Sequence, residues 1–396
     1  MDISFFLPTD SGMFLGFNAD ARAPVVPRLV PGTADGGHAF VALGSGGSAE
    51  ASVNVHGIAI ALDMAAARPL EGNEPEPGAR EPGDALRAAL ATASTAEGAR
   101  DAIVAMAERC LASRRVPLSR ARLHAMYLIM AADGAYRLET AGRRWAWKSL
   151  DYPDCFAGSY ALDDDYKRVD AATRKAIAPV NERMACLDEA DPGRVGSKES
   201  WRVYVEARGP TAAGEFRRRA LLPLLAPAAQ AGTRAAAFAL LRAHRVPDLG
   251  LPLRHRDACG HGGPFGDGRN ASSMLVELDR ATGALTAWFT AAPLACANLF
   301  KPVPVVDGRF VPLWDGLGMG EPADATRPVA YWSARRAALS GAAGSIGRAE
   351  ARAGALAEAQ ATVAESVDAY RSGNRGPGPA AAIARAVADW DAAKLP

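Results

Sequence analysis

Short apolar runs separated by turn residues dominate the first sixty positions of the chain. Residues 3–7 and 13–17 are two such runs, and the stretch between them, PTDSG at 8–12, has the composition of a turn. Residues 52–62 (SVNVHGIAIAL) alternate and are rich in β-branched side chains, with a tight turn or bulge expected at His56-Gly57. The pattern predicts a series of strands in this part of the chain.

Two hairpins are predicted further along. Residues 123–131 and 135–138 flank Asp133-Gly134, a dipeptide that strongly favours a two-residue hairpin turn. Residues 143–150 continue as a further strand, and a second hairpin joins residues 272–278 to residues 284–290. Hairpins pair antiparallel strands, so the sheets are predicted to be antiparallel.

Apolar residues at helical spacing fill most of the remaining chain. Residues 70–83 have loop composition, and a helical pattern begins at Asp84. Further helices are predicted over residues 163–187, 212–225, 228–244, 329–370 and 380–390. Strands, helices, strands and a helical tail predict an antiparallel α+β layered domain. We expect this domain over residues 1–328, with helical insertions, and a helical extension over residues 329–396 packed on it.

Charge and cysteine content argue against a nucleic-acid-binding, membrane-surface or disulfide-rich protein. The chain has 45 Lys and Arg against 44 Asp and Glu, a net charge of +1, which gives no electrostatic case for a nucleic-acid or membrane-surface partner. Its 5 cysteines include no CxxC pair, so reduced thiols are expected rather than a disulfide framework. No apolar stretch approaches the roughly 20 residues that span a bilayer, and the N-terminus does not resemble a signal peptide. A soluble, cytoplasmic protein is predicted.

Three groups of residues suggest chemistry on local grounds alone. Asn18 and Asp20 lie at the end of a predicted strand, where they could line a polar site or form a turn. Asn54 and His56 lie in another strand, and such a histidine is more often a core or turn residue than a base.

The third group combines His255, Cys259 and His261 within seven positions. Their spacing matches no standard metal site and no fourth ligand is evident. The flanking glycines favour a close-packed loop, so we expect neither a metal nor a cofactor.

Four stretches, in order, resemble the secernin family and its relatives, the dipeptidase-A-type cysteine peptidases. They are the opening MDISFFLPTDSGMFLGFNADAR, NVHGIAIA at 54–61, YLIMAADGAYRLETAGRRWAWKSL at 127–150, and residues 257–306, which begin DACGH and end NLFKPVPVV. The resemblance implies a four-layer αββα sandwich of the N-terminal nucleophile hydrolase type, with the active site where the first strand begins. In that family an N-terminal cysteine attacks an amide carbonyl, and its own α-amino group serves as the base.

This sequence departs from the family at the attacking position. Aligning Leu7-Pro8 with the family's Leu-Pro places Met1 at the cysteine, and a thioether has no proton to lose. Asp2, Asn18 and Asp20 match the family pattern. Ser4 could replace the nucleophile only if three residues were removed, which would shift the strand register and invert its facing.

The surroundings of the attacking position also differ. Phe17 stands where the family has Lys, Leu62 stands where a polar Asn often follows, and Ser159 falls near a family Asn or Gln. Taken with the resemblance, the predicted catalytic residues are Met1, Asp2, Asn18, Asp20 and Asn54. The predicted substrate-binding residues are Phe17, His56, Leu62, Ser159, His261, Arg269 and Asn270.

Three functions remain open from the sequence. The pocket of an amide-bond hydrolase or acyltransferase could act on an amino-acid- or peptide-like small molecule through acids and bases, without a cysteine nucleophile. The chain could instead be a non-catalytic ligand-binding or scaffold relative, or a conventional C–N hydrolase whose native N-terminus differs. The expected partner is the small-molecule or peptide-like ligand, and the Ala-rich tail could mediate homo-oligomerisation or simply cover the sandwich.

Overall fold

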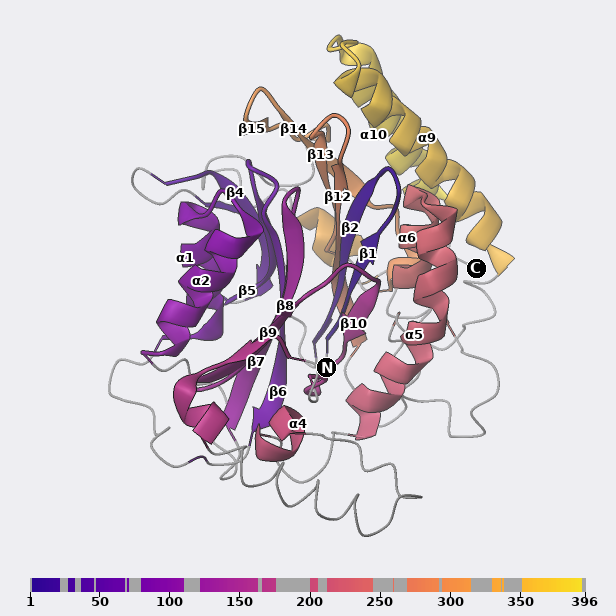
Figure 1. The fold of residues 1–396 in the computed structure, drawn as a ribbon. Coiled ribbons are helices and arrows are strands. Elements are labelled where there is room, and N and C mark those ends of the chain that lie inside the picture. The colour runs from indigo at the N-terminus through magenta and orange to yellow at the C-terminus, as the bar shows by residue number, and fades with distance from the viewer. Residues whose placement is uncertain are drawn as a thin grey trace.

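The computed structural model covers the chain in a set of well-placed segments. It describes residues 2–21, 28–32, 37–45, 48–67, 70, 80–109, 122–162, 166–175, 200–205, 212–244, 259, 269–291, 294–314, 330–335, 337 and 351–393. Within these residues two β-sheets lie face to face, and helices cover the outer face of each sheet (Figure 1). The predicted four-layer αββα sandwich with a helical C-terminal tail is therefore confirmed.

One sheet contains seven strands within the described residues, in the order β10-β1-β2-β12-β13-β14-β15. All of its pairings are antiparallel. The strands are β1 (Ile3–Pro8), β2 (Gly12–Ala21), β10 (Asp154–Phe156), β12 (Arg269–Asp279), β13 (Leu285–Thr290), β14 (Lys301–Val306) and β15 (Arg309–Phe310). The first strand is thus an inner strand of the sheet, between β10 and β2.

The second sheet contains eight antiparallel strands within the same residues, in the order β11-β9-β8-β7-β6-β5-β4-β3. They are β3 (Arg28–Gly32), β4 (Phe40–Ser45), β5 (Ser48–Asn54), β6 (Ala59–Ala67), β7 (Arg122–Ala131), β8 (Gly134–Ala141), β9 (Arg144–Ser149) and β11 (Arg168–Val169). The expected turn at His56-Gly57 separates β5 from β6, and Gly57 adopts the positive φ of 80° that favours glycine. The expected hairpins around Asp133-Gly134 and residues 279–283 are confirmed.

Helices complete the outer layers. The helices α1 (Pro82–Thr92) and α2 (Ala96–Ala107) cover the eight-stranded sheet, while α5 (Ala212–Ala231) and α6 (Arg234–Arg242) cover the seven-stranded one (Figure 1). The outer face of the eight-stranded sheet packs on α1 and α2 through a separate apolar cluster that includes Ile60, Leu86 and Ile103. The short helix α4 (Ser200–Val205) buries Trp201 in the main core.

Two sequence expectations about helices need correction. Within the helix expected over residues 163–187, Arg168 and Val169 form β11 instead, because Trp147 and Ala146 of the edge strand β9 offer pairing partners. A helical turn follows at residues 171–175, begun by Asp170, whose carboxylate accepts the Thr173 N–H at 2.9 Å. The part of the expected helix beyond residue 175 lies outside the described residues.

The helix pair expected over residues 212–244 has its boundary at a different residue. The predicted break near Pro227 does not occur, and α5 runs through both Pro223 and Pro227. The chain breaks instead at Gly232, where φ is 64°, and Thr233 then caps α6 by accepting the Ala236 N–H at 3.2 Å.

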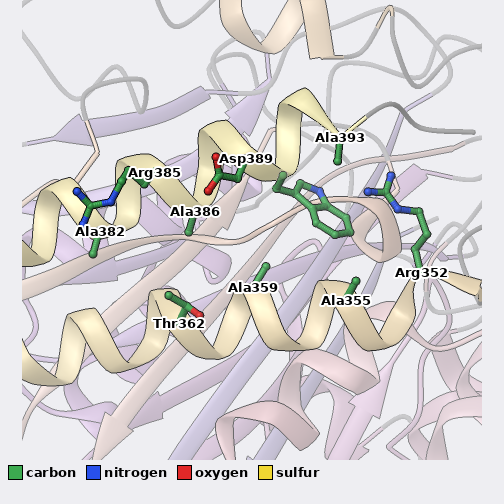
Figure 2. Close-up of a pocket in the computed structure, with 10 residues that line it drawn as sticks. Arg352, Ala355, Ala359, Thr362, Ala382, Arg385, Ala386, Asp389 and Ala393 are labelled. Carbon is green, nitrogen blue, oxygen red and sulfur yellow. The ribbon is translucent and has the colours of Figure 1, made fainter.

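The C-terminal helices α9 (Ala353–Arg371) and α10 (Pro377–Ala392) lie against each other beyond α6 (Figure 1). They add Val363, Val367 and Trp390 to the main core. Alanines of both helices line a groove between them (Figure 2), and Arg352 lies 4.5 Å from the centre of the Trp390 ring at one end. The helices of the described segments include none long and apolar enough to cross a membrane.

Candidate functional site

The start of β1 points acidic and hydroxyl side chains into the space between the two sheets. Successive side chains of a strand face opposite ways. Phe5 lies on the helix-covered face, over Gly16 of β2, where a Cβ atom would come within 2.2 Å of the phenyl ring. Asp2 and Ser4 therefore face the other sheet.

Asp2 is held at the end of the β1–β2 pair. Its Oδ1 accepts the backbone N–H of Asp20 at 2.8 Å. The Asp20 carboxylate turns the other way, toward α5, and forms a buried ion pair of 2.6 Å with Arg217. Asp2 and Asp20 thus lie together, but their carboxylates face opposite sides of the sheet.

Asp63 provides the second carboxyl group of the inter-sheet space. It lies in β6, where Ala61 and Ala65 point inward with it, and its side chain is only 1% exposed. Its two oxygens accept backbone N–H groups, Oδ1 from Met64 at 2.7 Å and Oδ2 from Gly158 at 2.5 Å. These bonds fix the carboxyl group in place from both sides.

The two carboxyl groups influence each other's protonation. Burial raises the pKa of Asp63 to about 8, and the negative charge of Asp2 adds to this rise. Desolvation raises the pKa of Asp2 to about 6, although the positive charge of the chain's amino terminus and that of Arg217 oppose it. At neutral pH Asp2 is therefore mainly ionised and Asp63 mainly protonated, so that the pair shares one proton.

A loop after β10 borders this pair and is fastened to the inner face of the eight-stranded sheet. Asp63 holds Gly158, and Glu139 of β8 accepts the N–H groups of Ala161 and Leu162 at 2.8 and 3.1 Å. Burial raises the pKa of Glu139 above its ordinary value. The loop therefore places Ser159, a predicted substrate-binding residue, next to the Gly158 amide that contacts Asp63.

Two serine hydroxyls near the pair are buried without hydrogen-bond partners among the described residues. They are Ser4 Oγ, on the same face of β1 as Asp2, and Ser159 Oγ. Burying a hydroxyl group without a hydrogen-bond partner destabilises the folded protein. A polar ligand between the sheets could supply the missing partners.

Several predicted residues lie on the helix-covered side of the same sheet. Asn18 donates from Nδ2 to the Leu241 carbonyl of α6 at 2.9 Å. Asn270, opposite Asp20 at a bulge in β12, accepts the Ala295 N–H at 3.3 Å. Both amides bind backbone groups where β2 and β12 meet the segments that cover them.

Asn54, His56 and Leu62 lie away from Asp2, on the other side of the eight-stranded sheet. Asn54 donates to the Leu90 and Ala93 carbonyls at 2.9 Å each, which ties the β5–β6 turn to the end of α1. His56 is exposed and contacts His38 at 3.1 Å, and Leu62 packs in the apolar cluster beneath α1 and α2. The structure does not bring these three residues to the carboxyl pair.

The remaining predicted residues divide between the core and the undescribed segments. Phe17 is buried between the sheets, on the face of β2 opposite Asn18. Met1 and His261 lie outside the described residues, as does His255. The backbone of Arg269 pairs with Ala21 at the start of β12, and its side chain is not described.

Sequence reasoning missed Asp63 and Arg217. Asp63 has a readable signal, because a single carboxylate in AIALDMAAA occupies the phase of small inward-facing alanines, where charged residues are rarely buried without a role. Arg217 belongs to a run of three arginines in α5, and nothing in that run distinguishes it from its neighbours.

Comparison with known proteins gives likenesses to solved structures only. No protein-family profile and no curated protein matches the chain. A variant of the conjugated bile acid hydrolase from Clostridium perfringens matches with a TM-score of 0.41 and 11% identity, covering 79% of this chain and 96% of that chain. Penicillin V acylase from Agrobacterium tumefaciens matches with a TM-score of 0.34 and 13% identity, covering 78% and 87%. At these identities the likeness concerns the fold alone, and the resemblance to secernins stays a prediction.

Proposed function

We propose that this protein hydrolyses a carbon–nitrogen bond in an amino-acid- or peptide-like small molecule, with Asp2 and Asp63 as its acid–base pair. The single observation that carries the proposal is that two carboxyl groups, Asp2 at the start of β1 and Asp63 in β6, lie between the sheets, close enough for the charge of Asp2 to raise the pKa of Asp63. Paired carboxyl groups of which one is ionised and the other protonated can remove a proton and donate one in the same step.

The proposed reaction uses water as the nucleophile. The Asp2 carboxylate takes a proton from water as the oxygen attacks the amide carbon, and protonated Asp63 gives its proton to the carbonyl oxygen. When the tetrahedral intermediate collapses, Asp2 gives its proton to the departing nitrogen and Asp63 recovers one from the hydroxyl group. The products are an acid and an amine, and both carboxyl groups return to their starting states.

The choice of an amide-type substrate rests on the sequence resemblance and on the polar groups around the pair. Ser4 and Ser159 offer buried hydroxyls that could bind a polar substrate. Phe17, in place of the family's lysine, supports a less polar ligand than a dipeptide.

The direct test is hydrolysis of a panel of N-acyl amino acids, dipeptides and amino-acid amides, with the released amine measured by mass spectrometry. We expect a bell-shaped dependence of kcat/KM on pH, with limbs near the pKa values of about 6 and about 8. Asp2→Asn and Asp63→Asn should each lower kcat by about 10²–10⁴-fold.

Asp170→Asn is the matched control, because Asp170 is also buried but caps a helical turn beside β11. Its activity should stay within about two-fold of the wild-type value, since ordinary substitutions away from the reacting groups leave the barrier unchanged. Turnover that survives both site substitutions would overturn the acid–base role. Ligand binding without turnover of any substrate in the panel would instead support a binding protein.

A further inference from the structure

Three soft metal-ligating side chains meet at the C-terminal end of α6, on the helix-covered side of the seven-stranded sheet. His244, Cys259 and Cys296 come from three separate parts of the chain, and their ligand atoms all lie within 4.8 Å of one another. Both cysteines are buried, neither is in a disulfide, and His244 is half-buried. The sequence pattern grouped Cys259 with His255 and His261, which lie outside the described residues, and the fold brings His244 and Cys296 to it.

Backbone hydrogen bonds position two of these residues. The Cys259 N–H donates to the Ala243 carbonyl at 3.2 Å, so this cysteine is fixed to the end of the helix that precedes His244. Cys296 lies in the 3-10 helix η2 (Ala295–Ala297), whose first N–H donates to Asn270 Oδ1 at 3.3 Å. These backbone hydrogen bonds hold the two cysteines in position before any metal binds, as a preorganised site requires.

Arg242, at the end of α6, places a positive charge beside both cysteine sulfurs. Its guanidinium donates to the Ala295 and Asn298 carbonyls at 3.3 and 3.2 Å, beside Cys296.

We infer that His244, Cys259 and Cys296 bind a zinc ion. Thiolate and imidazole ligands favour zinc among the common divalent ions. Binding releases the two thiol protons to solvent, and two thiolates with Zn²⁺ form a neutral centre beside the Arg242 guanidinium, without any change of oxidation state. In a tetrahedral zinc site the donor atoms are about 3.5–3.8 Å apart, so the three side chains need to close by about 1 Å or less.

The inferred site would join α6 to η2 and is independent of the proposed hydrolysis. Three protein donors leave the fourth tetrahedral position to a further ligand, whose identity X-ray absorption would report. Because Asn18 of β2 also binds the Leu241 carbonyl of α6, a metal here stabilises the helix that covers the strand next to β1.

The test uses the full chain without a polyhistidine tag, reduced and kept under nitrogen, then loaded with Zn²⁺ or Co²⁺ and dialysed. We expect one ion per chain by elemental analysis and, for cobalt, a sulfur-to-metal charge-transfer band with tetrahedral d–d bands. At about 100 times the dissociation constant, zinc should raise Tm by about 3–8 °C.

Variants assign the ligands. Cys296→Ser and His244→Ala should each lose the retained ion and the tetrahedral cobalt spectrum. Cys155→Ser, which removes another buried cysteine that is not in a disulfide, should keep both. If Cys296→Ser does not fold, the half-exposed His244 and the cobalt spectrum of the unmodified chain still decide the question. No retained ion, equal retention by the His244→Ala variant, or a Cys259–Cys296 disulfide that resists reduction would overturn the inference.

Discussion

The two faces of the eight-stranded sheet differ sharply in chemistry, although the same strands build both. In β6, Ile60 and Leu62 point toward α1 and α2, while Asp63 between Leu62 and Met64 points toward the other sheet. In β8, Leu138 faces the helices, and Arg137 and Glu139 face inward. One face is an apolar helix–sheet interface, and the other contains buried charges.

The inner face of the eight-stranded sheet therefore includes the free-energy cost of burying charged side chains. A buried charge is costly unless it is paired or hydrogen-bonded, and replacing both members of a buried ion pair with apolar groups is often neutral or stabilising. Arg137 pairs with Asp154 at 2.7 Å, and Glu139 accepts the Trp201 indole N–H at 2.9 Å. Asp63 differs from both, because the charge of a neighbouring acid, Asp2, adds to the rise that burial causes in its pKa.

The largest effect is expected from Arg137→Ala on the inner face. Arg137 is fully buried and also donates to the Cys155 carbonyl at 2.7 Å. Its loss leaves Asp154 buried without its cation, so the free energy of unfolding should fall by about 3–5 kcal/mol in urea denaturation. The double variant Arg137→Met with Asp154→Leu should recover part of that loss. A single variant as stable as the wild type would contradict the pairing.

The next effect is a pH dependence caused by Asp63. The folded-state pKa of Asp63 is raised to about 8, so folding favours its protonated form. The stability that the protonated carboxyl group contributes is fully present below the unfolded pKa and is lost as the pH rises toward 8. Between about pH 5 and about pH 8, the stability of Asp63→Asn relative to wild type should therefore rise by about 3–4 kcal/mol.

Asp279→Asn is the control for this pH dependence. Hydrogen bonds from Thr282 lower the pKa of Asp279. The stability that ionised Asp279 contributes is therefore present above the unfolded pKa and is lost only in acid. Its stability relative to wild type should stay constant over the same pH interval. Parallel pH curves for wild type and Asp63→Asn would show that Asp63 has an ordinary pKa.

A somewhat smaller effect is expected from Ile60→Ala on the apolar face. Ile60 is fully buried beneath the helices, and removing its side chain should cost about 2–4 kcal/mol of unfolding free energy, with no dependence on pH. Measured by thermal unfolding at two pH values, this variant separates ordinary packing from the behaviour of Asp63. A loss that changes with pH would show that the two faces are coupled.

The smallest effect is expected from Thr95→Ala at the start of α2. The Thr95 hydroxyl accepts the Gly98 N–H at 3.0 Å, and loss of such a cap costs about 1 kcal/mol. Thr95→Ser should retain most of that stability, because serine can accept the same hydrogen bond. Equal destabilisation by both substitutions would show that the hydroxyl is not the stabilising group.

The sequence predicts most strands because alternation and turn residues are local signals. The two hairpins follow from Asp133-Gly134 and from residues 279–283, and β5 and β6 follow from the turn at His56-Gly57. The strand at Arg168–Val169 could not be predicted, because it depends on the free edge of β9. The continuation of α5 through Pro223 and Pro227 likewise overrides local propensity.

In the candidate site too, local sequence signals predict some features, while contacts between distant segments determine the others. Asp2 and Asp20 are close in the structure because pairing of β1 with β2 is local in sequence, and the resemblance already placed them together. Asn54 and Leu62 are close in sequence to Asp63, but strand alternation and the turn direct them to the helices. The meetings of Asp2 with Asp63, and of Cys259 with His244 and Cys296, depend on contacts between distant segments, which local patterns do not encode.

Titration of the carboxyl carbons by NMR, in protein labelled with ¹³C at aspartate, shows whether Asp2 and Asp63 form a coupled acid–base pair. With Asp2→Asn and Asp63→Asn used to assign the signals, we predict that the pair titrates in two steps near pH 6 and near pH 8, and that removing Asp2 lowers the pKa of Asp63. Two carboxyl groups that both titrate near pH 4, each unaffected by loss of the other, would show that Asp2 and Asp63 are not an acid–base pair.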